Sequence, residues 1–279
     1  MQTPTVIHTG IALAMLTTGL AAMPAYAQDT AATAAPTVEQ MARERQNPVS
    51  GLRSVFLQDV VLPVGQGNAN SFSIQPVWPF RLGHKWRLNT YTIIPIQWLP
   101  PLYAGGSRSS GLGNVLFNAF LRPQTPSKLP FTWGIGPALQ LPTRTTPELG
   151  SSALSMGPTG LLYYAGKTVS AGLVAQNLWS LNASGSNRVN FFSSQYIFYY
   201  NLPKGWYIES NATITANWLA TNPSNVWLVP LGGGPGKTFQ LRKGGLFYSA
   251  AMQGFYNAAR PAGVGSWMAI AQLQIIFSM

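Results

Sequence analysis

The chain has 279 residues and a formal net charge of +11; 46% of its residues are hydrophobic and only 8% are charged. A soluble domain carries roughly 25% charged residues, so a water-facing surface is hard to build from this composition. After the N-terminus no apolar run reaches the roughly 18 residues that a membrane-spanning helix needs, and the lack of cysteine excludes disulfides and thiolate metal sites.

The N-terminus indicates export. Thr9 to Ala22 is an apolar run, and Ala25-Tyr26-Ala27 matches the small-x-small pattern that precedes signal cleavage. We therefore expect residues 1–27 to be a secretory signal peptide and residues 28–50 to be a mobile periplasmic segment, with a short helix favoured over Val38 to Gln46. An exported chain meets little nucleic acid, so its positive charge points to the phosphates of lipopolysaccharide instead.

From Arg53 onward the hydrophobic pattern has a period of two, which is typical of β-strands. In WYIESNATITANW, residues 206–218, alternate side chains form an apolar face with a Trp at each end, and the opposite face is almost wholly polar. Turn signals divide the chain into about twelve strands, at 53–62, 71–80, 86–98, 111–122, 130–141, 154–165, 168–181, 188–201, 206–218, 226–241, 246–258 and 266–277.

Two of these strands, 86–98 and 206–218, have an apolar face bounded by two Trp. Twelve residue steps give roughly 40 Å of strand, which a tilt of about 40° reduces to roughly 30 Å, enough to cross an apolar band of about 25 Å. A water-soluble sandwich is the alternative, but its outer faces would carry many charges, whereas the polar faces here carry Asn, Gln, Ser, Thr and Gly. Only a closed barrel satisfies the backbone of strands in hydrocarbon.

We therefore predict an all-β fold, a transmembrane antiparallel up-and-down β-barrel over residues 51–279, in the outer membrane of a Gram-negative-type bacterium. An even strand number puts both termini on the periplasmic side. The five connections on that side each contain a lysine, and the opposite connections tend to be longer and contain arginines. The lysines are Lys85, Lys128, Lys167, Lys204 and Lys243; the arginines are Arg108, Arg144, Arg188 and Arg260.

The alternation also predicts which side chains face the lumen and which form aromatic girdles at the two membrane interfaces. The predicted lumen-lining residues are Asn89, Gln97, Asn114, Asn118, Gln140, Gln176, Gln195, Glu209, Asn211, Asn217, Gln253, Gln272 and Gln274. The predicted girdle residues are Trp86, Trp98, Trp133, Trp179, Trp206, Trp218, Trp267 and Phe277. Amides at mid-strand favour a narrow, mostly neutral passage; alternatively, they plug the barrel by hydrogen bonding one another.

Two further features, a glycine run and a single histidine, do not indicate a binding or catalytic site. Pro230 and Gly232-Gly233-Gly234 interrupt the tenth strand and predict a bulge or bend, because the run lacks the spacing of a phosphate loop. His84 is the one histidine after the signal peptide, and it falls in a predicted turn. One histidine and scattered acids offer no metal-ligand cluster.

Several stretches appear in the order found in a known family: NPVSGLRSVFLQ (47–58), FSIQPVWPF (72–80), GLGNVLFNAFLRP (111–123), GIGPALQLPT (134–143), MGPTG (156–160) and NLWS (177–180). Over residues 38–277 the chain resembles the bacterial outer-membrane transporter family of the meta-pathway of phenol degradation, often mislabelled neuromedin U. The resemblance implies a single-domain barrel that passes small solutes, aromatic ones among them, and no catalytic residues. Unlike the usual aromatic assembly signal, this chain ends with Ser278 and Met279 after Phe277.

We therefore expect a passive outer-membrane channel or transporter, not an enzyme, with no cofactor. The expected partners are outer-membrane lipid and lipopolysaccharide, the barrel-assembly machinery and a small-molecule solute, with no nucleic acid; we expect a monomer. Two alternatives stay open. One is a closed barrel with a structural or surface-interaction role, and the other is a lipid-modifying hydrolase that uses His84.

Overall fold

The structure is a computed structural model that describes residues 36–124, 130–183, 187–242 and 244–277. The expected signal peptide, residues 28–35, Lys128, Lys243, Ser278 and Met279 lie outside the described residues. Within the described part of the chain, no helix is long and apolar enough to cross a membrane.

One α-helix, α1 (Val38–Glu44), precedes the strands. The strands are β1 (Arg53–Val64), β2 (Gly67–Leu82), β3 (Trp86–Leu99), β4 (Ser109–Leu112), β5 (Val115–Pro123), β6 (Phe131–Leu141), β7 (Ser155–Ala165), β8 (Val169–Ser180), β9 (Asn190–Asn201), β10 (Trp206–Ser210), β11 (Thr213–Asn217), β12 (Trp227–Gln240), β13 (Phe247–Ala259) and β14 (Trp267–Phe277). Short 3₁₀ helices lie in the connections, at Pro147–Leu149, Pro203–Gly205 and Pro223–Asn225.

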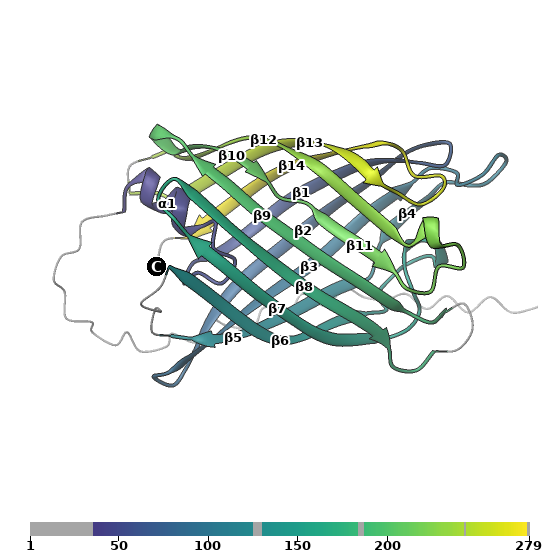
Figure 1. Cartoon of the computed structure of the whole chain (residues 1–279), viewed down its shortest axis with the longest axis horizontal. Coiled ribbons are helices and arrows are strands. Elements are labelled where there is room, and N and C mark those ends of the chain that lie inside the picture. The colour runs from purple at the N-terminus through teal and green to yellow at the C-terminus, as the bar shows by residue number, and fades with distance from the viewer. Residues whose placement is uncertain (1–35, 125–129, 184–186, 243, 278–279) are drawn as a thin grey trace, which may run out of the picture. The chain divides into compact units, whose positions relative to one another are not determined.

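These 14 strands form a closed antiparallel barrel (Figure 1). β4 and β5 both pair with β3, and β10 and β11 both lie between β9 and β12, so each of these pairs is one interrupted strand and the barrel has twelve. The ring closes where β1 pairs with β14, from Arg53 opposite Phe277 to Val61 opposite Ala269. The predicted up-and-down barrel is confirmed.

The two interruptions have different local causes. Between β4 and β5, the register against β3 shifts by one residue, which is a bulge at Gly113 and Asn114. Between β10 and β11 the register against β9 is unbroken. There the backbone N–H of Asn211 donates to Gln253 Oε1 at 3.0 Å, so a side chain takes the place of a ladder partner. The predicted bend in the tenth strand is a register shift between Val229 and Pro230, while Gly232 to Gly234 stay within β12.

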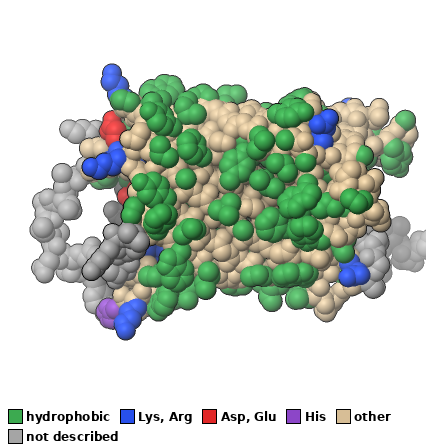
Figure 2. All heavy atoms as spheres, in the orientation of Figure 1, with side chains coloured by type: hydrophobic (Ala, Val, Ile, Leu, Met, Phe, Trp, Pro, Cys, Tyr) green, Lys and Arg blue, Asp and Glu red, His purple; other side chains and the backbone are tan. Residues whose placement is uncertain are grey.

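The outer wall of the barrel is apolar. Large hydrophobic side chains are exposed along the strands, such as Ile135 at 59%, Leu162 at 54% and Leu173 at 47%. Figure 2 shows hydrophobic side chains over the wall, while Lys and Arg lie near its two ends. So large an exposed apolar surface needs hydrocarbon around it. The barrel therefore spans a membrane.

The two ends of the barrel differ. The terminal end holds the start of β1, the end of β14 and five connections, at 83–85, 124–130, 166–168, 202–205 and 241–246. The loop end holds the tight β1–β2 turn and five connections of seven or more residues, at 100–108, 142–154, 181–189, 218–226 and 260–266. Lys85, Lys167 and Lys204 lie in turns of the terminal end. That this end faces the periplasm stays a prediction.

Residues 36–50, which belong to the segment expected to be mobile, contact the barrel. A capping box on Thr37 and Gln40 starts α1, and its contacts with β12 and β13 join it to the barrel. Met41 is 2% exposed because it packs in a cluster with Leu52, Phe247 and Ile276. The helix was expected, but its burial was not, and residues from Pro36 onward form one compact unit with the strands.

Candidate functional site

The candidate site is a cavity of about 150 Å³ inside the barrel. Six of the thirteen predicted lining residues surround it: Asn118, Gln176, Gln195, Asn211, Gln272 and Gln274. Gln58, Gln75 and Ser193 also line it, although the sequence analysis did not select them. Their inward direction follows from the same alternation that placed the others, so this signal was present in the sequence.

The remaining predicted lining residues lie elsewhere in the wall. Glu209 and Gln253 are buried and bonded to each other, with Gln253 Nε2 donating to Glu209 Oε1 at 2.7 Å. Asn89 donates to the Ser50 carbonyl at 2.8 Å, and Asn114 donates to the Ser151 carbonyl at 2.8 Å, which fastens the 142–154 connection. Asn217 lines a separate pocket at the loop end, and Gln97 and Gln140 are half-buried in β3 and β6.

Much of the cavity lining is apolar, which differs from a uniformly polar lumen. The apolar and aromatic lining residues are Phe56, Val77, Tyr91, Ile93, Leu116, Phe120, Val174, Ile197 and Tyr199. The amides between them are partly paired: Gln75 Nε2 donates to Gln58 Oε1 at 2.8 Å, and Gln195 Nε2 donates to Asn211 Oδ1 at 2.9 Å. Tyr91 Oη donates to Gln75 Oε1. The lining can therefore accept an apolar body and bond a few polar groups.

Arg45, just beyond α1, reaches into the lumen and is not among the predicted lining residues. Its Nε donates to Thr238 Oγ1 at 3.1 Å and its Nη1 donates to Gln274 Oε1 at 3.3 Å. The guanidinium carbon lies 4.3 Å from the centre of the Tyr207 ring and 5.3 Å from that of Tyr199. Such stacking on aromatic faces stabilises a desolvated cation.

The charge of Arg45 survives its burial. Burial acts to lower the pKa of the guanidinium, but the surrounding Tyr207, Tyr199 and Glu209 outweigh it and hold that pKa above its usual value. The side chain is only 5% exposed, and within the described residues its Nη2 has no hydrogen-bond partner. A buried cation whose Nη2 has no partner among the described residues thus lies beside the cavity.

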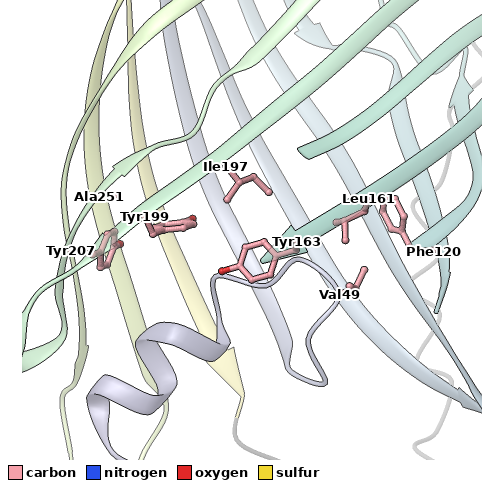
Figure 3. Close-up of a cluster of buried hydrophobic side chains, with 8 residues drawn as sticks. All are labelled: Val49, Phe120, Leu161, Tyr163, Ile197, Tyr199, Tyr207 and Ala251. Carbon is pink, nitrogen blue, oxygen red and sulfur yellow. The ribbon is translucent and has the colours of Figure 1, made fainter. Parts of the chain in front are cut away.

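The segment that carries Arg45 is fastened to the inner wall and narrows the lumen. Gln46 Nε2 donates to Asn201 Oδ1 at 2.7 Å, and Asn47 Nδ2 donates to Thr132 Oγ1 at 3.4 Å. Val49 is fully buried in a cluster of wall side chains that includes Tyr163 and Ile197 (Figure 3). We name residues 45–52 the inner segment.

The Trp side chains lie on the outside of the barrel. The seven predicted girdle tryptophans are 40 to 47% exposed, while Phe277 is half-buried. Trp78 and Trp227, which the sequence analysis did not select, are both 38% exposed. Trp218 Nε1 donates to Asn177 Oδ1 at 2.9 Å. This bond gives Asn177 a partner on the otherwise apolar outer face of β8, where Leu173 and Trp179 are exposed.

We propose that these tryptophans contact lipid, and brominated lipids test it. Bromine quenches indole fluorescence on contact, so vesicles of brominated phosphatidylcholine should quench most of the Trp emission of the inserted barrel, because all nine indoles are exposed. Acrylamide in the water phase should quench far less. Emission unchanged by the brominated lipid would contradict the proposal.

Among the described residues, no group of three or more His, Asp or Glu side chains could hold a metal ion. His84 lies exposed in the turn between β2 and β3, away from the cavity lining.

Comparison with known proteins gives similarity of fold. No protein-family model matches the chain, and no curated protein matches it in sequence. The COG4313 outer membrane channel from Pseudomonas putida F1 is similar with a TM-score of 0.60 and 14% identity, over 81% of this chain and 94% of that chain. The NanC porin gives a TM-score of 0.49 and 8% identity, over 81% and 100% of the two chains. Outer membrane phospholipase A from Escherichia coli gives 0.43 and 10%, over 81% and 92%. The first of these similarities shows that the chain has the fold of an outer-membrane barrel.

Proposed function

We propose that the protein is a passive outer-membrane channel or transporter that admits small aromatic or weakly polar solutes through its lumen. The observation that carries this proposal is the cavity, whose lining combines amides with aromatic and aliphatic side chains. A few placed polar groups in a mostly apolar pocket are what a small-molecule site needs for orientation.

The cavity volume suits a single-ring solute. Its volume of about 150 Å³ is comparable to that of an engineered apolar cavity of about 150 Å³, which binds benzene. Phe56, Tyr91 and Phe120 offer ring edges and faces, and Gln176 and Gln272 offer amide groups to a hydroxyl. The resemblance to the meta-pathway family and the similar fold of the P. putida outer membrane channel agree with this proposal.

Blocking the cavity tests the proposal. Ser193 in β9 lines the cavity, so Ser193→Trp should fill it. In proteoliposomes we expect the wild-type protein to accelerate entry of phenol over protein-free liposomes, and the variant to fall to the protein-free rate. Leu173→Trp is the matched control, because Leu173 is 47% exposed on the outer wall. Equal uptake by wild type and Ser193→Trp would refute passage through the cavity.

A closed barrel is the second candidate, because the inner segment occupies part of the lumen. Asn89 donates a hydrogen bond to the Ser50 carbonyl, and Gln46 donates one to Asn201. Hydrogen bonds to the strands therefore hold the inner segment near both of its ends. Wild-type proteoliposomes that take up no more phenol than protein-free liposomes would favour the closed barrel and a structural or surface-interaction role.

A further inference from the structure

Three arginines stand side by side on neighbouring strands at the terminal end. Arg81 of β2 pairs directly with Arg87 of β3, and Arg87 pairs directly with Arg122 of β5. Directly paired residues of antiparallel strands project to the same face. That face is the lumen, because Val77 and Phe120 lie on the same sides of their strands and line the cavity. We name Arg81, Arg87 and Arg122 the arginine row.

Like charges directly opposite each other destabilise a sheet, so the row needs neutralisation. Arg87 and Arg122 line a vestibule of about 680 Å³ between the inner wall and α1, and Arg43 and Lys167 line it as well. Among the described residues that line it, Glu44 is the one acidic side chain. Four cations therefore face one carboxylate in this vestibule.

The arginine row also has donors to spare. Arg87 Nε is buried and has no hydrogen-bond partner among the described residues. Arg122 donates from Nη1 to the Pro123 carbonyl at 3.0 Å and from Nε to Asn89 Oδ1 at 3.4 Å. Its partners are thus neutral oxygens, and no acid in the described residues pairs with it. Burial raises the pKa of the Glu44 carboxyl, an effect that Arg87 partly opposes, so the one counter-charge is itself weakened.

We propose that Arg87 and Arg122, with Arg81 at the rim, form a binding site for the oxyanion group of a small solute and give the lumen a preference for organic anions. The planar guanidinium fork matches a carboxylate or a phosphate with two parallel hydrogen bonds. This inference rests on the proposed function, because it names the solute class: a small aromatic or aliphatic carboxylate whose charge meets the row. The lumen-facing position and the cover of α1 favour such a solute over an acidic protein.

Calorimetry on the purified, detergent-solubilised full chain reads the site without requiring conduction. At low salt we expect benzoate to bind at least about tenfold more tightly than benzamide, its neutral analogue of similar shape, because a hydrogen bond to a charged group is worth more than a neutral one. Arg87→Gln with Arg122→Gln should abolish the benzoate preference. Arg53→Gln is the matched control: Arg53 lies at the same end, but it packs over the Trp78 ring on the outer wall, 5.1 Å from its centre.

Equal affinity for benzoate and benzamide would overturn the proposal, and so would an equal loss of benzoate binding in Arg53→Gln. In a second experiment, inorganic phosphate competes with benzoate for the site. Phosphate that displaces benzoate supports the oxyanion site, and tighter binding of phosphate than of benzoate would assign it to phosphorylated solutes. Glu44→Gln should tighten benzoate binding, since it removes the counter-charge; weaker binding would also contradict the proposal.

Planar-bilayer recordings under a KCl gradient then read selectivity. The wild type should prefer chloride, the double arginine variant should lose that preference, and Arg53→Gln should keep it. A conducting wild type without anion preference would overturn the inference and leave the proposed channel intact. Failure of phenol uptake together with intact benzoate binding would refute the channel and leave the anion site.

Discussion

Arg45→Ala is expected to release the inner segment from the barrel wall and to raise conductance. The substitution removes two side-chain hydrogen bonds, to Thr238 and Gln274, and the stacking on Tyr207 and Tyr199. Hydrogen bonds to charged groups and desolvated cation–π contacts are each worth about 2 kcal/mol, so we expect docking of the segment to weaken by about 3 kcal/mol after the relieved desolvation is allowed for. This corresponds to a shift of roughly 150-fold in the docking equilibrium.

Single-channel recording and limited proteolysis together measure this effect. Arg45→Ala should open more often or to a higher level, and a protease should cut the chain N-terminal to β1 faster than in the wild type. Arg45→Lys should give a partial effect, because lysine keeps the charge but lacks the planar fork. Arg242→Ala serves as the control, since Arg242 is exposed in the β12–β13 connection. Unchanged conductance and cleavage in Arg45→Ala would show that the segment does not depend on this side chain.

Gly236→Ala is expected to lower stability by about 2 kcal/mol, as overpacking of a tight site does. A Cβ at residue 236 would lie 2.2 Å from Tyr207 Cε2, so the tyrosine ring has to move. That ring is 1% exposed, packs edge-on against Tyr199 with a centroid distance of 5.7 Å, and carries the Arg45 guanidinium. Moving it therefore disturbs both the wall and the inner segment.

Gly254→Ala provides a matched control in the adjacent strand, because a Cβ there meets nothing within 4 Å. Heat-dependent mobility on SDS gels and denaturant unfolding in lipid vesicles both report the folded fraction. Gly236→Ala should unfold at a lower denaturant concentration than the wild type, and Gly254→Ala should match the wild type. Equal shifts in the two variants would mean that loss of glycine flexibility, rather than the clash with Tyr207, is responsible.

Which side chains of each strand point outward could be predicted from the sequence, because the outer face contacts hydrocarbon and must be apolar. Leu88 and Trp98 stand on one side of β3, and Asn89 and Gln97 stand on the other, as the alternation requires. The apolar share of the lining was not predicted. Phe120, Ile197 and Tyr207 also face inward, where the inner segment gives them apolar and aromatic-stacking partners such as Val49 and the Arg45 guanidinium.

The missed site residues share one cause: their positions depend on tertiary placement. Nothing in the local sequence around Arg45 indicates that it bonds Thr238 and Gln274, which are far along the chain. The pairing of Arg81 with Arg87 could be derived from the tight turn between β2 and β3. The pairing of Arg87 with Arg122 could not, because the connection at 100–108 is long and the bulge at Gly113 and Asn114 shifts the register.

The pairing of β1 with β14 has a consequence for biogenesis. The two strands whose hydrogen bonds close the barrel lie at opposite ends of the described chain, so this seam is the most non-local strand pairing among the described strands. Loop closure over that separation is slow and costly in chain entropy. Before the last two strands pair, the nascent sheet has two open edges. Their backbone N–H and C=O groups find no hydrogen-bond partners in lipid. A chain truncated before Trp267 is therefore expected to aggregate before it inserts into the membrane. A chaperone that covers both open edges would suit this architecture.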